Sequence, residues 1–146
     1  MTLQNWKNNR WLKPHTTSKQ EITQLLEIVD RDLKDSKQHK LSADWRFGIA
    51  YNAALKLCTI LMYLEGFKPE KALAHYRTLQ ALPLILGPKR DDDADYLNSC
   101  RAKRNIVEYD YVGGATDADA NELISFVKEL KNEVLDWIKL KYPQYL

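Results

Sequence analysis

Residues 42–66, SADWRFGIAYNAALKLCTILMYLEG, decide the fold of this chain. Ser42 can cap a helix, Asp44 suits the positive end of the helix dipole, and Gly66 is a typical stop. Between these signals the stretch is apolar around most of a helix circumference, which is typical of a helix surrounded by protein. Its one polar stripe consists of Asn52, Lys56, Thr59 and Tyr63. The stretch therefore predicts the central helix of a helical bundle.

Helix signals also dominate on both sides of this stretch, and strand signals are nearly absent. Ser18 and Glu21 form a capping box, in which the Ser hydroxyl accepts a backbone N–H while the Glu reaches back. Pro69 stands where a third helix would begin, and Pro83 would kink or end it near residue 82. Besides the central helix, we expect helices over about 19–38, 69–82 and 93–111, and a last one from Thr116 or Asp117 to about 138.

This order of elements predicts an all-α, up-and-down helical bundle of about five helices with short connections. We expect residues 18–146 to form the bundle and residues 1–17 to form a basic and aromatic arm ahead of it. With Trp6 and Trp11 among its cations, the arm could hold single-stranded RNA by stacking and charge, or it could dock on a partner subunit.

The composition fits one globular domain. The chain has 146 residues, of which 45% are hydrophobic, and its 22 Lys and Arg against 20 Asp and Glu leave a net charge of +2. A protein that binds nucleic acid over a broad surface usually has a clear basic excess, so any RNA contact would be local. Cys58 and Cys100 lack the spacing of a metal or redox motif. We expect two buried free thiols, no metal and no cofactor.

The sequence shows no targeting or membrane segment. Residues 1–15 are polar and lack the apolar run of a signal peptide. The longest apolar stretch, residues 49–64, is interrupted by polar side chains, so we expect it to be too polar to span a bilayer. These features predict a cytoplasmic protein with no membrane partner.

The fourth predicted helix breaks its own apolar pattern. At about 100° per residue, its apolar seam covers an arc of about 80°. Arg104 occupies the middle of this seam, and burying an unpaired guanidinium would cost several kcal/mol. Arg104 could therefore form an ordinary helix-surface pair with Glu108, or face a solvated groove at a helix or dimer interface and grip a phosphate. The seam residues are Leu97, Cys100, Arg104, Val107 and Tyr111, with Arg101, Asn105 and Glu108 beside them.

Residues 100–111, CRAKRNIVEYDY, resemble the motif helix of the HEPN superfamily (higher eukaryotes and prokaryotes nucleotide-binding domains). Residues 51–55, YNAAL, and 76–83, YRTLQALP, resemble its small prokaryotic members, and the likeness extends over about residues 18–138. The resemblance implies a homodimer in which two motif helices meet. In catalytic members it implies metal-independent cleavage of RNA through the ribose 2′-hydroxyl.

The family motif is an Arg, four to six variable residues and a His. Arg104 and Asn105 match the Arg and the polar residue that often follows it, whereas Tyr109 stands where the His belongs. Because an ordinary Tyr has a pKa near ~10, Tyr109 would be a poor general base at neutral pH, although it could donate a hydrogen bond or act as an acid. The resemblance thus implies a toxin-type or defence-type ribonuclease, or a degenerate relative. The alternative is a non-catalytic module that binds a nucleotidyltransferase partner or a nucleotide.

The resemblance also implies a role for each polar residue of this helix. Arg104 would stabilise the charge on the scissile phosphate, Asn105 would orient the phosphate or the Arg, and Glu108 would position the guanidinium. The positive charges of Arg101 and Lys103 would help to bind RNA or phosphate.

Tyr111 lies two residues after Tyr109. In one branch of the family a Tyr in this position receives a nucleotide from a nucleotidyltransferase antitoxin. Tyr111 is therefore a candidate modification site, and in the simpler interpretation it completes the apolar seam.

Other polar residues carry weaker signals. The three histidines, His15, His39 and His75, show no metal-ligand spacing and are expected to be ordinary surface or core residues. Asp91, Asp92 and Asp93 fit a solvated loop and the start of a helix. Asn52 and Lys56, on the polar stripe of the central helix, could face Arg104 and help to build its pocket.

Overall fold

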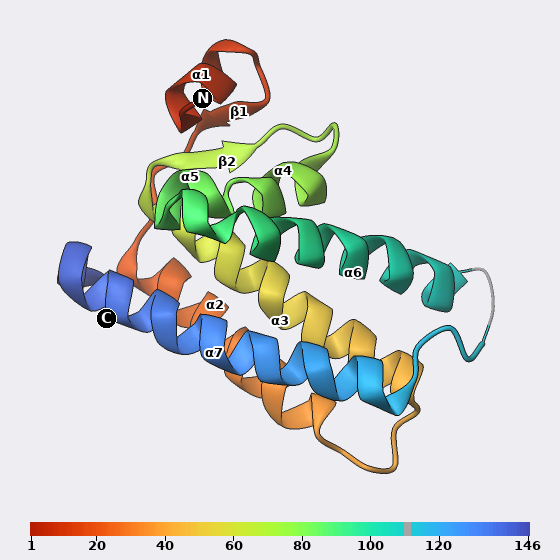
Figure 1. Cartoon of the computed structure of the whole chain (residues 1–146). Coiled ribbons are helices and arrows are strands. Elements are labelled where there is room, and N and C mark those ends of the chain that lie inside the picture. Colours follow the sequence, from red (N-terminus) through yellow and green to blue (C-terminus); the bar gives the residue numbers. More distant parts are fainter. Residues whose placement is uncertain (110–111) are drawn as a thin grey trace.

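Helix α3 (Ala43–Leu64) forms the centre of the molecule in a computed structural model, which describes residues 1–109 and 112–146 (Figure 1). Its N-terminus is capped as expected, because the Ser42 hydroxyl accepts a hydrogen bond from the Trp45 backbone N–H at 3.2 Å. Helices α2 (Lys19–Ser36), α6 (Asp91–Tyr109) and α7 (Asp117–Lys141) pack around it. The predicted all-α bundle with a central helix is therefore confirmed.

The burial of α3 explains its composition. Ala50, Ala54, Leu57 and Leu61 are fully buried among side chains of the surrounding helices. Contrary to the sequence expectation, α3 is long and apolar enough to cross a membrane by length and composition. Two thirds of its most apolar window is buried inside the protein, as in a core helix. Its hydrophobicity thus serves the packing of the bundle.

The ends of the long helices follow their capping residues, with one difference. Ser18 begins α2 and accepts the Glu21 N–H, but the Glu21 carboxylate does not complete the expected capping box. It instead accepts the Thr17 hydroxyl at 2.7 Å and contacts the His15 imidazole at 2.6 Å. Those side chains belong to the segment that enters α2, so Glu21 fixes the direction of that segment. Thr116 begins α7 with a complete capping box.

The prediction of a third helix over residues 69–82 is wrong for the first part of that range. Residues Phe67–Pro69 form strand β2, which pairs antiparallel with strand β1 (Leu12–Pro14). A proline lacks an N–H to donate and is tolerated at a sheet edge, so Pro69 can end this two-stranded sheet. Helix α4 (Ala74–Gln80) begins only after Leu73, whose φ of 56° is left-handed. The short helix α5 (Leu82–Leu86), with Pro83 in its first turn, and the 3₁₀ turn Pro88–Arg90 lead into α6.

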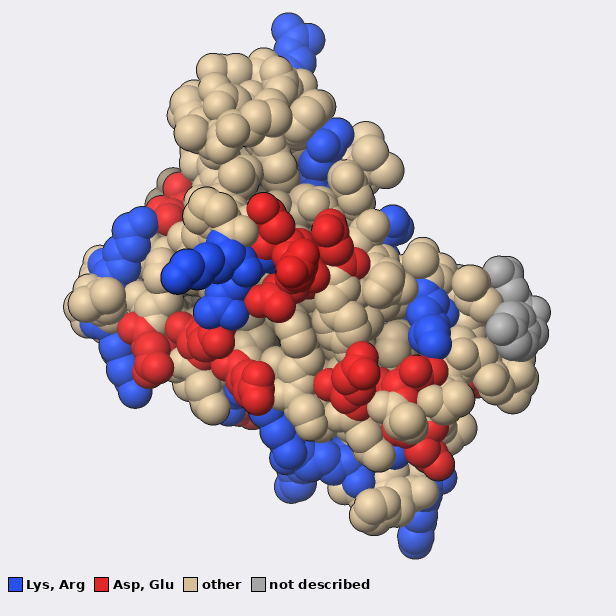
Figure 2. All heavy atoms as spheres, viewed as in Figure 1, with Lys and Arg blue, Asp and Glu red and all other residues tan. Residues whose placement is uncertain are grey.

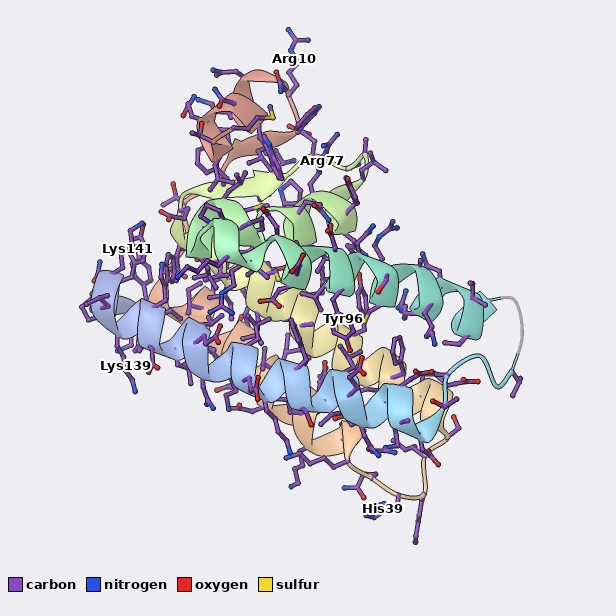
Figure 3. All side chains as sticks on the ribbon, in the orientation of Figure 1. Arg10, His39, Arg77, Tyr96, Lys139 and Lys141 are labelled. Carbon is purple, nitrogen blue, oxygen red and sulfur yellow. The ribbon has the colours of Figure 1, made fainter. Side chains whose placement is uncertain are left out.

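The N-terminal segment packs on one end of the bundle, as Figure 1 shows. Helix α1 (Leu3–Asn8) and β1 bury Trp6 and Leu12 in a small cluster with Met62 and Ala81. The Arg77 guanidinium of α4 lies over the Trp11 ring at 3.6 Å from its centroid, between the segment and the bundle (Figure 3). The N-terminal segment therefore packs against α4 through this contact between Trp11 and Arg77.

Both cysteines are buried free thiols, as expected. Burial raises the pKa of Cys58 to about 12. Burial likewise raises the pKa of Cys100 to about 11, because a thiolate would lose its hydration. Both thiols therefore remain protonated and act as small apolar core groups near neutral pH.

Candidate functional site

A pocket of about 380 Å³ opens between the N-terminal half of α3 and the C-terminal half of α6. Its walls are largely apolar, formed by Trp45 and Ile49 from α3 and Val107 from α6. Arg104 and Asn52 place a guanidinium and an amide among these walls. Arg104 and Asn52 thus line one pocket, whereas Lys56, which was expected beside Asn52, is not among its lining residues.

Arg104 lies against a buried phenol. Its Cζ atom is 5.9 Å from the centroid of the Tyr51 ring, and Tyr51 is only 2% exposed. The Tyr51 hydroxyl has no hydrogen-bond partner among the described residues. Burial raises the Tyr51 pKa to about 12, although the charges of Arg101 and Arg104 act in the opposite direction. The site therefore contains a neutral phenol next to the Arg104 guanidinium.

Asn52 is held from the opposite side by α2. Its amide nitrogen donates to the Asp32 carboxylate at 2.6 Å. Asp32 is buried and also accepts from the Arg31 guanidinium at 3.0 Å. Because a buried carboxylate needs such partners, this contact fixes the Asn52 side chain in the pocket wall.

A second group of cations lies where α4 packs on α6. The Arg101 Cζ atom is 5.8 Å from the centroid of the Tyr76 ring, and its Nε donates to Asn98 at 3.0 Å. The neighbouring His75 has a pKa below its ordinary value, first because burial disfavours the imidazolium. The charges of Arg104, Lys56 and Arg101 lower it further, in that order. Three cations from two helices thus disfavour the imidazolium of His75, an exposed residue at the start of α4.

The structure separates the other residues of the predicted motif. Asn105 is exposed on α6. Lys103 lies in a different pocket, where its ammonium contacts the Asp119 carboxylate at 2.8 Å. The side chains of Glu108 and Tyr109 and the whole of Tyr111 lie outside the described residues. Arg104 is thus the motif residue that lines the pocket, and Arg101 lies three residues earlier on the same helix.

Sequence reasoning missed His75 and Tyr51. His75 carries no spacing signal because the charges that act on it, those of Arg101 and Arg104, belong to residues more than 20 positions later in the chain. Tyr51 could have been noticed as a hydroxyl on the otherwise apolar face of the central helix. Both join the site only through tertiary packing.

The surface around the site is uneven in charge and polarity. Figure 2 shows Asp and Glu gathered over the face formed by α6 and α7. At the pocket, Trp45 is 62% exposed and Val112 is 90% exposed, although both are large apolar residues. The pocket therefore has an exposed apolar rim.

The described residues contain no group of three or more His, Cys, Asp or Glu side chains that could hold a metal ion. Comparisons with family models, with curated proteins and with solved structures find no match to this chain. Any functional assignment must therefore come from the site itself.

Proposed function

We propose that this chain is a HEPN-like, RNA-directed protein that binds a phosphodiester at Arg104 and Arg101 and cleaves RNA without a metal ion. The observation that carries the proposal is the placement of two guanidinium groups three residues apart on α6: Arg104 lines an apolar pocket beside buried Tyr51, and Arg101 lies near the Tyr76 ring. Guanidinium groups can hold phosphate oxygens through paired, charge-assisted hydrogen bonds. The net charge of +2 is compatible with such a small site.

The pocket offers a place for a base next to the phosphate. Trp45 is exposed at its rim, and an indole ring can stack on a nucleobase for about 1–3 kcal/mol. Arg104 lines the same pocket, so one nucleotide could contact both side chains. This combination favours single-stranded RNA over a duplex, whose bases are already stacked.

The proposed reaction is an internal transfer of the phosphodiester. The ribose 2′-oxygen attacks the neighbouring phosphorus, and the bond from phosphorus to the 5′-oxygen breaks. The products are a 2′,3′-cyclic phosphate and a 5′-hydroxyl. Negative charge grows on the phosphate oxygens in the transition state, and Arg104 would stabilise it there. An enzyme that cleaves RNA in this way could act as a toxin or in defence, and we propose such a role for this chain.

The proposed enzyme acts as a homodimer. Ile106 is 40% exposed on α6, and Val112 follows the described end of that helix. Contact with a second copy would cover both apolar side chains and bring two Arg104 sites together. Sedimentation analysis should detect a dimer, and a monomer at micromolar concentration would contradict this part of the proposal.

Cleavage of total RNA tests the function. The purified protein is incubated with RNA in the presence of EDTA, and Arg104→Ala is compared with Lys139→Ala. The control substitution Lys139→Ala also removes one positive charge, from the C-terminal end of α7 (Figure 3). We expect Arg104→Ala to lower the rate about 10²–10³-fold, as when a transition-state donor is lost, with Lys139→Ala unchanged. If the wild type does not cleave RNA, or if the two variants cleave it at equal rates, the proposed ribonuclease activity is refuted.

A non-catalytic module is the second candidate, favoured by Tyr109 in the position of the motif His. In this case the same pocket binds a nucleotide or a nucleotidyltransferase partner without cleaving RNA. Titration with ATP should then show binding that Arg104→Ala abolishes. If a nucleotidyltransferase is the partner, mass spectrometry after co-expression should find a nucleotide on Tyr111.

A further inference from the structure

A groove of about 380 Å³ lies between the second half of α2 and the middle of α7. Its described lining has no residue in common with the pocket that contains Arg104. Four lysine side chains line it, and we call it the lysine groove. The polar residues of this lining are Asp30, Lys34 and Lys37 from α2 and its end, and Lys128, Lys131 and Asn132 from α7.

The two helices bring these lysines to one groove. The two lysines of α2 are three residues apart, and so are the two lysines of α7, which places each pair on one face of its helix. Buried Leu33 fixes α2 in the core, and buried Leu130 fixes α7 there. The lysine groove is therefore built on two packed helices.

Most of the positive charge in the lysine groove is not neutralised within the protein. Lys131 forms an ion pair with Asp30. Among the described residues, Lys34, Lys37 and Lys128 form no ion pair. The charge of Lys128 is the main reason that the pKa of Lys37 is below its ordinary value, and desolvation and the charge of Lys131 add to this effect. The ammonium groups therefore repel one another in the free protein.

The helix dipole explains the position of only two of the four lysines. Lys34 and Lys37 lie at the C-terminal end of α2, where a positive charge is favourable. Lys128 and Lys131 lie in the middle of α7, well before its last turn, so the dipole gives them no such advantage. A bound anion would offset the repulsion between the two pairs.

We propose that the lysine groove binds a short oligophosphate chain, at a second site that does not depend on the proposed function. An ammonium binds phosphate as a point charge, so several ammonium groups favour a ligand with several phosphates in a row. The described lining has no aromatic side chain on which a base could stack. The ligand is therefore recognised through its phosphates.

The surroundings of the lysine groove favour a short chain over a long nucleic acid. Figure 2 shows Lys and Arg gathered along the lower edge of the molecule, beside the acidic face of α6 and α7. A long RNA strand would extend over these carboxylates and be repelled by them. The volume of the groove is in the range of small-molecule sites, which suits a chain of a few phosphates.

Calorimetric titration with tripolyphosphate tests the site. The variant Lys37→Gln/Lys128→Gln removes one lysine from each side of the groove. The matched control, Lys19→Gln/Lys139→Gln, removes one exposed lysine from each of the same two helices outside the groove. We expect the first variant to weaken binding about tenfold or more and the control to stay within about twofold of the wild type. Orthophosphate should bind at least about tenfold more weakly than tripolyphosphate, because it contacts fewer lysines.

A thermal melt without ligand provides an independent measurement. Lys37→Gln/Lys128→Gln relieves repulsion in the free protein, so it should be at least as stable as the wild type. If it melts at a lower temperature than the control variant, the like-charge argument is wrong and the inference fails.

The outcomes distinguish the lysine groove from the pocket around Arg104. If tripolyphosphate does not bind, or binds equally to the two double variants, the inference is refuted and the proposed function is unaffected. If Arg104→Ala abolishes this binding, the phosphate chain belongs to the Arg104 pocket and the inference also fails. The same holds if an RNA oligonucleotide with a 5′-hydroxyl binds the groove more tightly than tripolyphosphate.

ATP identifies the source of the phosphate chain. It is titrated into Arg104→Ala, so that the Arg104 pocket does not contribute. An affinity equal to that of tripolyphosphate assigns the groove to the phosphate tail of a nucleotide, and a weaker affinity assigns it to a free oligophosphate.

Discussion

Asp44 connects the first turn of α3 to the segment that follows α6. One carboxylate oxygen accepts the Gly113 backbone N–H at 2.7 Å, and the other accepts the Ala115 N–H at 3.0 Å. Asp44 also lines the pocket that contains Arg104. These two hydrogen bonds therefore hold the chain between α6 and α7 against α3, at the edge of the candidate site.

Removing this carboxylate should destabilise the protein measurably. Hydrogen bonds to charged groups contribute about 1.5–3 kcal/mol each, and partial solvent exposure lowers that to about 1 kcal/mol each here. We therefore expect Asp44→Ala to lower the free energy of unfolding by about 2 kcal/mol. Asp44→Asn keeps one acceptor oxygen but turns an N–H group toward a backbone donor, so it should lose about half as much.

Urea denaturation followed by circular dichroism measures both changes. Asp136→Ala, an exposed substitution on α7, serves as the control and should cost at most about 0.5 kcal/mol. A thermal melt should show a decrease of about 4–8 °C for Asp44→Ala, given about 2–4 °C per kcal/mol for a protein of this size. If Asp44→Ala is as stable as Asp136→Ala, or Asp44→Asn is as stable as the wild type, this account of the tether is wrong.

Two other contacts allow stability predictions. Arg77→Ala should destabilise the protein by about 1–2 kcal/mol in urea, because it removes the guanidinium that lies 3.6 Å from the centroid of the Trp11 ring. Arg77→Lys should restore little of this loss, since an ammonium cannot stack as a guanidinium does, and full recovery would contradict the stacking argument. The hydrogen bond from Lys103 lowers the pKa of Asp119 from 3.8 to about 2, with the Thr116 N–H contributing next. A carboxylate with a lowered pKa stabilises the fold above its unfolded pKa, so this contribution should be lost as the pH falls from about 4 to about 2. Asp119→Asn should therefore flatten the dependence of stability on pH in that range, and an unchanged slope would exclude the ion pair as its source.

Local sequence signals were sufficient to predict the long helices. Ser18, Ser42 and Thr116 are each found at a helix start, and the apolar faces of α2, α3 and α7 meet in one core. These features depend on neighbouring residues and on the 3.6-residue period, both of which are visible in a sequence. By contrast, Phe67–Pro69 becomes a strand because Leu12–Pro14, more than 50 residues earlier, pairs with it. A three-residue strand of this kind has no pattern of its own.

The candidate site likewise contains some residues that the sequence indicated and others that it did not. Arg104 was noticeable because it interrupts an apolar seam, and Asn52 because it lies on the polar stripe of α3. The contact of Tyr76 with Arg101 depends on where α4 begins, and that start is set by the left-handed residue Leu73 and by the preceding strand. The exposure of Trp45 was equally unpredictable, since a Trp near the start of a core helix is usually buried. Such details are decided by tertiary packing.

The pairing of β1 with β2 has a consequence for the order of folding. Residues 12–14 leave the ribosome well before residues 67–69, so β1 has no partner strand while α2 and α3 are being made. Contacts between segments far apart in the sequence form slowly, because closing a long loop costs entropy. The α2–α3 hairpin can therefore form first, and α4 receives its support from Trp11 only when the two strands meet. The N-terminal segment would therefore be the last part of the chain to dock on the bundle, although it is the first part to be synthesised.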